Sequence, residues 1–207
     1  MREEFERIFR EHVSRKGANE LLTWLSGTDF FKAPASTRFH GAHEGGLCEH
    51  SVNVYRRLSQ GCAVKGYPAE TLAVCGLLHD LCKVNFYKVS TRNVKNEETG
   101  KWEKVPFYQV EDQFPFGHGE KSVWLIERFL RLTTEEAAAI RWHMGGFDEA
   151  AKGGSFAASA AFEKWLLCVE LHVADLRATY LDEEREDVKC RYDIITTNGK
   201  SLYFQGV

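Results

Sequence analysis

An apolar run that ends in a charged pair constrains this chain more than any other feature. Residues 72–78 read LAVCGLL, and His79-Asp80 follows them directly. A carboxylate beside so much apolar sequence is costly to bury unless a cation or hydrogen-bond donors pair with it. An imidazole and a carboxylate side by side can bind one divalent cation together, or the carboxylate can bridge two. We therefore expect His79 and Asp80 to belong to a buried metal centre.

The rest of the chain supplies partners for this centre at intervals. They are His50, His118, His143 and Asp175. His50 is three residues after Leu47 and four before Val54, so in a helix it faces the core, and Asp175 shares a face with Leu171. A shell of nitrogen and oxygen ligands favours hard or borderline metals, namely Mn, Fe, Co, Ni, Mg or Zn.

Length and composition indicate one domain over 1–207. The 207 residues carry a net charge of −3, which argues against a generally basic nucleic-acid surface. The six cysteines form no CxxC pair, and the N-terminus has no signal-peptide core. No apolar run approaches the roughly 20 residues that span a bilayer. We expect a reduced cytoplasmic protein without disulfides or a membrane span.

Helical periodicity predicts a mostly α fold. The expected helices cover about 5–13, 20–25, 47–58, 69–81, 120–132, 135–144 and 157–181, with a capping box at Thr133 to Glu136. Residues 84–117 change to an aromatic, strand-like composition, which predicts a β-hairpin inserted into the helical scaffold. The tail, 182–207, is charged and then β-like. Its LYFQG at 202–206 resembles a protease-tag site, so its origin stays open.

Several motifs together resemble the HD superfamily of metal-dependent phosphohydrolases. Residues 45–51, GGLCEHS, resemble the entry to the first ligand, His50. Residues 78–83, LHDLCK, resemble the LHDIGK motif, with Leu81-Cys82 in place of Ile-Gly. Residues 174–178, ADLRA, resemble the distal helix that carries the last ligand. The resemblance spans Arg38 to about Leu181.

The resemblance implies a single-domain helical bundle with its core at about 38–181. It implies the binuclear branch of the superfamily, with two divalent ions held by His50, His79, Asp80, His118, His143 and Asp175. Asp80 would bridge the ions, and a hydroxide between them would attack a phosphomonoester or phosphodiester. The expected substrate is a nucleotide or short oligonucleotide, without a membrane partner or a stable nucleic-acid complex.

Other polar residues are candidates for substrate contacts. Lys83 would neutralise a phosphate in the catalytic centre. Alternatively, it has only a structural role as a cation at a helix end. The candidate substrate-binding residues are His40, His43, Lys121 and Arg177, each of which could instead belong to a packed loop or the surface. Aromatic side chains of the insertion could stack a base above the pocket, or could anchor the hairpin to the core.

Two other functions remain open. Some HD proteins with the same six ligands are diiron oxygenases, and ligand identity alone does not separate iron redox chemistry from hydrolysis. A non-catalytic, ligand-sensing HD domain is the third possibility. The presence of all six candidate ligands ranks it last.

Overall fold

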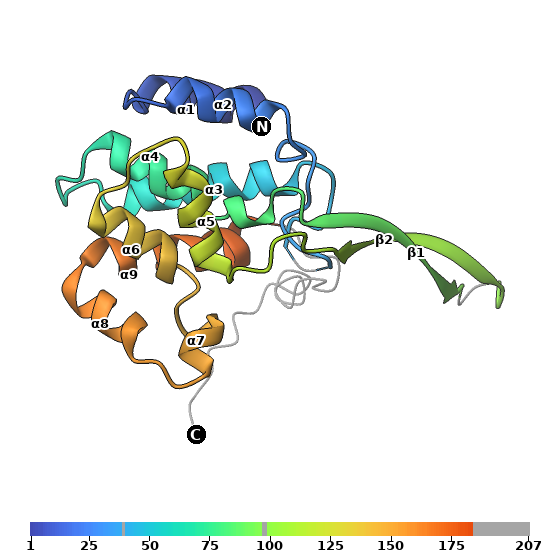
Figure 1. The fold of residues 1–207 in the computed structure, drawn as a ribbon. Helices are drawn as coiled ribbons and strands as arrows, with labels where there is room; N and C mark the ends of the chain where they lie inside the picture. Colours follow the sequence, from blue (N-terminus) through green and yellow to red (C-terminus); the bar gives the residue numbers. More distant parts are fainter. Residues whose placement is uncertain (39, 97–98, 184–207) are drawn as a thin grey trace, which may run out of the picture.

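The chain folds into a helical bundle with one projecting hairpin, as the sequence predicts (Figure 1). The computed structural model describes residues 1–38, 40–96 and 99–183, so most of the predicted β-like tail lies outside the described residues. The α-helices are α1 (Arg2–His12), α2 (Ala18–Ser26), α3 (Gly46–Gly61), α4 (Ala69–Leu78), α5 (His118–Glu127), α6 (Thr134–Trp142), α7 (Glu149–Lys152), α8 (Ala157–Lys164) and α9 (Leu166–Arg177). Short helical turns follow α4, α6 and α9: η1 (Leu81–Lys83), η2 (Gly145–Phe147) and the π-helical η3 (Ala178–Asp182).

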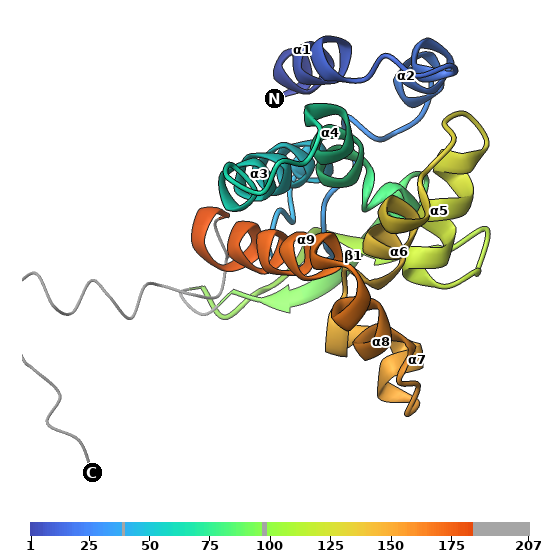
Figure 2. The ribbon, with the colours of Figure 1, turned by 90° about the vertical axis from the view of Figure 1, so that its left-hand side faces the viewer.

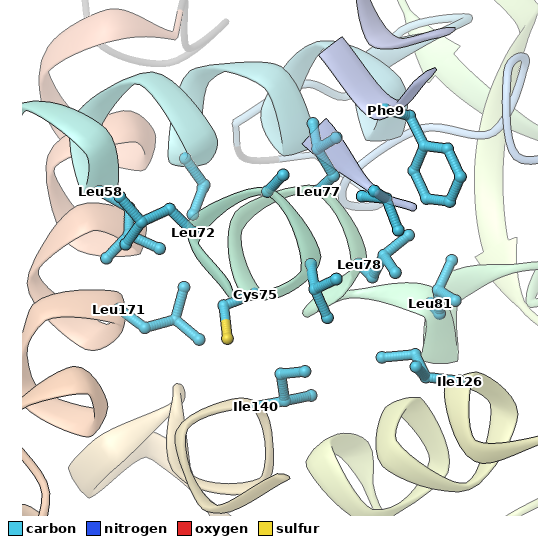
Figure 3. Packing of buried hydrophobic residues seen from close by; sticks show 14 of the residues in the cluster. Phe9, Leu58, Leu72, Cys75, Leu77, Leu78, Leu81, Ile126, Ile140 and Leu171 are labelled. Carbon is cyan, nitrogen blue, oxygen red and sulfur yellow. The ribbon is translucent and has the colours of Figure 1, made fainter. Parts of the chain in front are cut away.

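The α4 helix forms the centre of the core. Every residue from 72 to 78 is buried, as expected for a helix that is apolar on all sides. Leu58 of α3, Leu171 of α9 and Ile140 of α6 surround it (Figure 3). Helices α1 and α2 lie on one side of α3 and α4, and α9 lies on the other (Figures 1 and 2).

A glycine sets the close approach of α3 and α4. A Cβ at Gly76 would lie 2.5 Å from the Cα of Tyr55, a separation that real side chains do not tolerate. Because Gly76 has no side chain, the two helix backbones can nearly touch. This contact brings His50 on α3 and His79 at the end of α4 to the same point in the core.

Three expected helices differ from the structure. The helix expected over 120–132 ends at Glu127. The helix expected over 69–81 ends at Leu78, and η1 follows after Asp80, which leaves the α conformation at φ −104° and ψ 22°. The single helix expected over 157–181 is wrong, because Trp165 is extended and separates α8 from α9. Neither proline nor glycine marks this break. Trp165 instead packs its partly buried ring against the core, so tertiary packing overrides the local helical pattern.

The inserted hairpin consists of β1 (Tyr87–Lys95) and β2 (Trp102–Val110), paired antiparallel with Tyr87 opposite Val110. The ribbon projects away from the helices (Figure 1). Backbone bonds from Glu111 to Phe86 and from Asn96 to Lys101 fix the alternation of the ladder. The pair Thr91–Pro106 therefore falls at a position without hydrogen bonds, where the missing N–H of proline costs no ladder bond.

A buried carboxylate ties the first part of the chain to α6. Glu136 completes the predicted capping box with Thr133. Its two oxygens also accept bonds from Arg15 at 2.8 and 3.0 Å, and one accepts from the Thr71 hydroxyl at 2.9 Å. Within the described residues, no helix is long and apolar enough to cross a membrane.

Candidate metal centre

The structure brings the six predicted ligand residues together at the meeting point of five helices. His50 lies within α3, His79 and Asp80 follow α4, His118 begins α5, His143 follows α6, and Asp175 lies on α9. His50, His79, Asp80 and His143 are at most 2% exposed. The side chains of Asp175 and His118 are 15% and 31% exposed, so they form the open side of the cluster.

A second close-packed glycine, Gly119, brings His118 near His143. A Cβ at Gly119 would lie 2.1 Å from the carbonyl oxygen of Arg141. The start of α5 therefore rests directly on the backbone near the end of α6. As a result, the His118 ring centroid lies 5.1 Å from that of His143.

Three imidazoles of the cluster are held by hydrogen bonds that point away from its centre. Nδ1 of His79 lies 3.0 Å from the carbonyl oxygen of Gly76, and Nδ1 of His143 lies 2.6 Å from that of Ile140. Nδ1 of His50 lies 2.8 Å from Oε1 of Glu183. Carbonyl and carboxylate oxygens only accept, so these partners assign the proton of each neutral ring to Nδ1. Each Nε2 then presents a lone pair to the interior.

The interior atoms of this group are close to one another. Nε2 of His50 lies 3.2 Å from Nε2 of His79 and 3.2 Å from Oδ1 of Asp175. Nε2 of His143 is buried and has no hydrogen-bond partner among the described residues, although it lies 3.4 Å from Oδ1 of Asp80. Several acceptor atoms therefore face one another.

The two oxygens of Asp80 face different neighbours. Oδ1 lies 2.9 Å from Nε2 of His118 and 3.4 Å from Nε2 of His143. Oδ2 lies 3.5 Å from Nε2 of His50 and 3.6 Å from Nε2 of His79. Asp80 thus stands between two sets of imidazoles, with one oxygen toward each.

Lys83 adds a positive charge to this carboxylate. Its Nζ lies 2.6 Å from Oδ2 of Asp80, and its side chain is 13% exposed. Burial alone would raise the pKa of Asp80, but Lys83 and the neighbouring histidines hold it well below its usual range. The carboxylate is therefore ionised at neutral pH.

The pKa values of His79 and His50 differ because their surroundings differ. Burial lowers the pKa of His79 to about 3, so its ring is neutral. Burial also opposes protonation of His50, but hydrogen bonds to Asp175 and Glu183 raise its pKa to about 10. Without another cation, a proton on His50 therefore balances part of the negative charge in the cluster.

A cavity of about 600 Å³ opens onto the cluster. Its lining includes Asp80, His118 and Asp175 from the cluster itself. Lys83, His40 and Tyr87 contribute further polar groups. The His40 ring centroid lies 5.1 Å from that of His50. His172 also lines the cavity, and its Nδ1 lies 2.6 Å from the carbonyl oxygen of His143.

Three of the predicted substrate-binding residues do not reach this cavity. The His43 side chain is 56% exposed and lies 3.1 Å from Glu49. Nζ of Lys121 lies 2.5 Å from a carboxylate oxygen of Asp112 and lines a neighbouring cavity instead. Arg177 is exposed and is not among the lining residues. Of the four candidates, the geometry supports His40 alone.

The aromatic residues of the insertion also lie elsewhere. Phe107 and Tyr108 line a separate cavity between the hairpin and the loop near His43. Phe114 and Phe116 stack on each other, and both contact the Trp124 ring in tilted or edge-on geometry. At the base of the ribbon, Tyr87 and Val110 line the cavity beside the cluster. The expected lid above the pocket is therefore not what the hairpin forms.

Sequence reasoning missed two residues of the site, Glu183 and the sulfur of Cys82. Glu183 lies eight positions after Asp175, which corresponds to the same face of a continued helix, but the expected helix stopped at 181. Cys82 was visible only as a replacement for glycine in the motif. Its Sγ lies 3.3 Å from Nδ1 of His118 and 3.9 Å from Oδ1 of Asp80.

These side chains could hold a metal ion. Among the described residues, the sets of potential ligand atoms that lie close enough together are His40–His50–Glu183, His50–His79–Asp80, His79–His143–Asp175 and Asp80–Cys82–His118. Comparison with protein-family models, with curated proteins and with solved structures finds no match to this chain.

Proposed function

We propose that the chain is an HD-type, metal-dependent phosphohydrolase that holds two divalent ions and cleaves a phosphoester of a nucleotide. The observation that carries the proposal is the group of inward-facing Nε2 atoms of His50, His79 and His143. These rings donate outward from Nδ1 and face two carboxylates with Nε2. Acceptor atoms packed so closely require a cation or a proton between them. The outward bonds also fix the ring tautomers, as they do for histidines that bind metals.

The residues divide into two positions that share Asp80. His50, His79, Asp80 and Asp175 would hold one ion, and Asp80, His118 and His143 would hold the other. Divalent ions bound there would polarise a phosphoryl oxygen and lower the pKa of a water molecule. Most side chains of the cluster are buried, but the cluster opens to the cavity at His118 and Asp175, so a phosphate can approach it from one side.

The chain's own groups around the cavity suit a phosphorylated substrate. The Lys83 ammonium lies at the wall of the cavity and can balance one phosphate charge. His40 lies beside it and can hydrogen-bond a phosphate oxygen. A cavity of about 600 Å³ lies in the range of sites for small ligands. Tyr87, Phe147 and Tyr180 line it and offer apolar surfaces to a base.

Metal content and a screen of phosphate esters test this function together. The purified protein, reconstituted with Mn²⁺ or Fe²⁺, should bind two equivalents by elemental analysis. It should hydrolyse nucleoside phosphates or phosphodiesters, and Asp80→Asn should abolish this activity while circular dichroism stays unchanged. Asp182→Asn, a matched change at a surface ion pair with Arg57, should leave activity intact.

Three results would contradict the proposal. If the protein binds no divalent ion, the whole proposal is contradicted. If binding saturates at one equivalent, the proposed second ion is contradicted. Oxygen consumption by the iron form, without hydrolysis of any ester, would favour the oxygenase alternative.

A further inference from the structure

The Cys82 thiol lies inside the cluster, although the proposed function assigns it no role. Its side chain is buried at 3% exposure, and its backbone N–H donates to the Ser122 hydroxyl at 3.0 Å. The bond to Ser122 on α5 fixes η1 against the helix that begins with His118. The sulfur is therefore held close to two candidate ligands, His118 and Asp80.

We propose that Cys82 is a thiolate ligand of the second ion, which makes that position softer than the first. This inference rests on the proposed function, since it requires that the cluster holds metal. The second position then consists of Asp80, Cys82, His118 and His143. The first position, with His50, His79 and Asp175, keeps a shell of nitrogen and oxygen only.

The distances fit a small tetrahedral site. Bonds of about 2.3 Å to sulfur and about 2.0–2.1 Å to nitrogen or oxygen place the ligand atoms roughly 3.3–3.6 Å apart. Sγ of Cys82 lies 3.6 Å from Nε2 of His118 and 3.9 Å from Oδ1 of Asp80. Oδ1 of Asp80 lies 3.4 Å from Nε2 of His143 and 2.9 Å from Nε2 of His118. Asp80, Cys82 and His118 therefore lie close enough together to share an ion, and the His143 ring would move toward them to become the fourth ligand.

His143 provides an independent sign that a ligand belongs at this point. Its ring is completely buried, and Nδ1 is used by the carbonyl oxygen of Ile140. Nε2 is left without a hydrogen-bond partner among the described residues and faces Oδ1 of Asp80. An unpaired buried nitrogen destabilises the fold unless something binds it. A cation held by Cys82, Asp80 and His118 would lie on the side of Asp80 Oδ1 that this nitrogen faces.

The thiolate changes which metals the second position prefers. Sulfur is a soft ligand that favours Zn²⁺ and Fe²⁺ over Mg²⁺, whereas the first position suits harder ions equally well. When the metal binds, the S–H bond breaks, the sulfur–metal bond forms, and the proton leaves to solvent. We therefore expect two unequal sites, of which the second discriminates strongly against Mg²⁺.

Titration of the metal-free protein with Co²⁺ tests this inference, because cobalt bound to a thiolate absorbs in the near ultraviolet. The wild type should develop this charge-transfer band as the second position fills. Cys82→Ser and Cys82→Ala should lose the band, and their affinity for that equivalent should fall roughly 10–100-fold or more. Cys62→Ser should keep it, because Cys62 is equally buried but follows α3 at its far end.

A second measurement covers the case in which the Cys82 variants do not fold. In the native wild type, bound Zn²⁺ should protect Cys82 from alkylation, as mapped by mass spectrometry, whereas Cys62 should react equally with and without metal. Binding of two Co²⁺ ions without the band, or a band that survives in Cys82→Ser, would overturn the thiolate ligand and leave the proposed function standing. Failure to bind any metal would overturn both.

Discussion

Nδ1 of His50 and Oε1 of Glu183 are 2.8 Å apart, in a contact between the N-terminal part of α3 and the residue that follows η3. Glu183 therefore holds the His50 ring with Nε2 toward Asp80 and Asp175. A carboxylate in this position fixes the tautomer of a metal-binding histidine and raises its basicity.

Removing this carboxylate should weaken metal binding without removing a ligand. Glu183→Ala is expected to lower divalent-metal affinity about 10–100-fold, as measured by competition with a chelating dye. Asp182→Ala changes the adjacent carboxylate, which pairs with Arg57 at the surface, and should leave the affinity unchanged. Equal effects of both variants would show that Glu183 acts only by packing.

Metal should stabilise the whole fold. Its candidate ligands come from five helices and span residues 50–175, so the unfolded chain does not present them together. At about 100 times the dissociation constant, one ion should add about 2.7 kcal/mol to the free energy of unfolding. Thermal unfolding should therefore shift to higher temperature with Mn²⁺ and shift back with chelator. Asp80→Asn should show no shift if Asp80 is required for binding.

The distal hairpin should be dispensable for catalysis. Replacement of Asn93 to Glu103 by a short glycine-containing turn should spare hydrolysis of nucleotides and of p-nitrophenyl phosphate alike, because none of the described residues of this segment lines the cavity. Tyr87→Ala, at the base of the same ribbon, should raise KM for the nucleotide more than for the small ester. A large loss of nucleotide turnover in the shortened variant would contradict this prediction and support a role for the hairpin as a lid.

Glu136 should be important for stability and not for chemistry. Glu136→Gln breaks a buried pair with Arg15 and should reduce the free energy of unfolding by about 3–5 kcal/mol, measured by urea denaturation. Glu163→Gln, an exposed position on α8, should change it little.

The loss of unfolding free energy in Glu136→Gln should also depend on pH. Burial opposes ionisation of Glu136, but bonds from Arg15, Thr133 and Thr71 hold its pKa below the usual value. A lowered pKa means that this stabilisation is complete above the unfolded-state pKa, about 4.3, and is lost as pH falls through the folded value. The gap between wild type and Glu136→Gln should thus narrow below about pH 4.

The sequence could identify His50 and His79 because each lies in a local pattern, whereas His118 and His143 stood out by their positions in the family resemblance. An apolar run before His79 and the helical spacing around His50 are visible without knowledge of the fold. The hairpin and the capping box at Thr133 are equally local, and the structure confirms both.

Other features depend on tertiary packing and could not be found in this way. The break at Trp165 has no local signal, and the partner of His50 lies 133 residues away at Glu183. The direction of the ribbon is likewise decided by how its ends leave η1 and α5. This is why aromatic residues expected above the site lie apart from it.

The place of Pro106 in the ribbon has a consequence for self-association. Because Thr91–Pro106 is a pair without ladder bonds, the missing N–H belongs to the outer edge of β2. That edge lacks a donor at its midpoint, whereas β1 contains no proline and keeps every outward donor. A further strand can therefore join the ribbon in full register beside β1 and not beside β2. Two such ribbons can pair through their β1 edges. The β2 edges then face outward, and the donor missing at Pro106 interrupts the continuous strand pairing that an open-ended fibre requires.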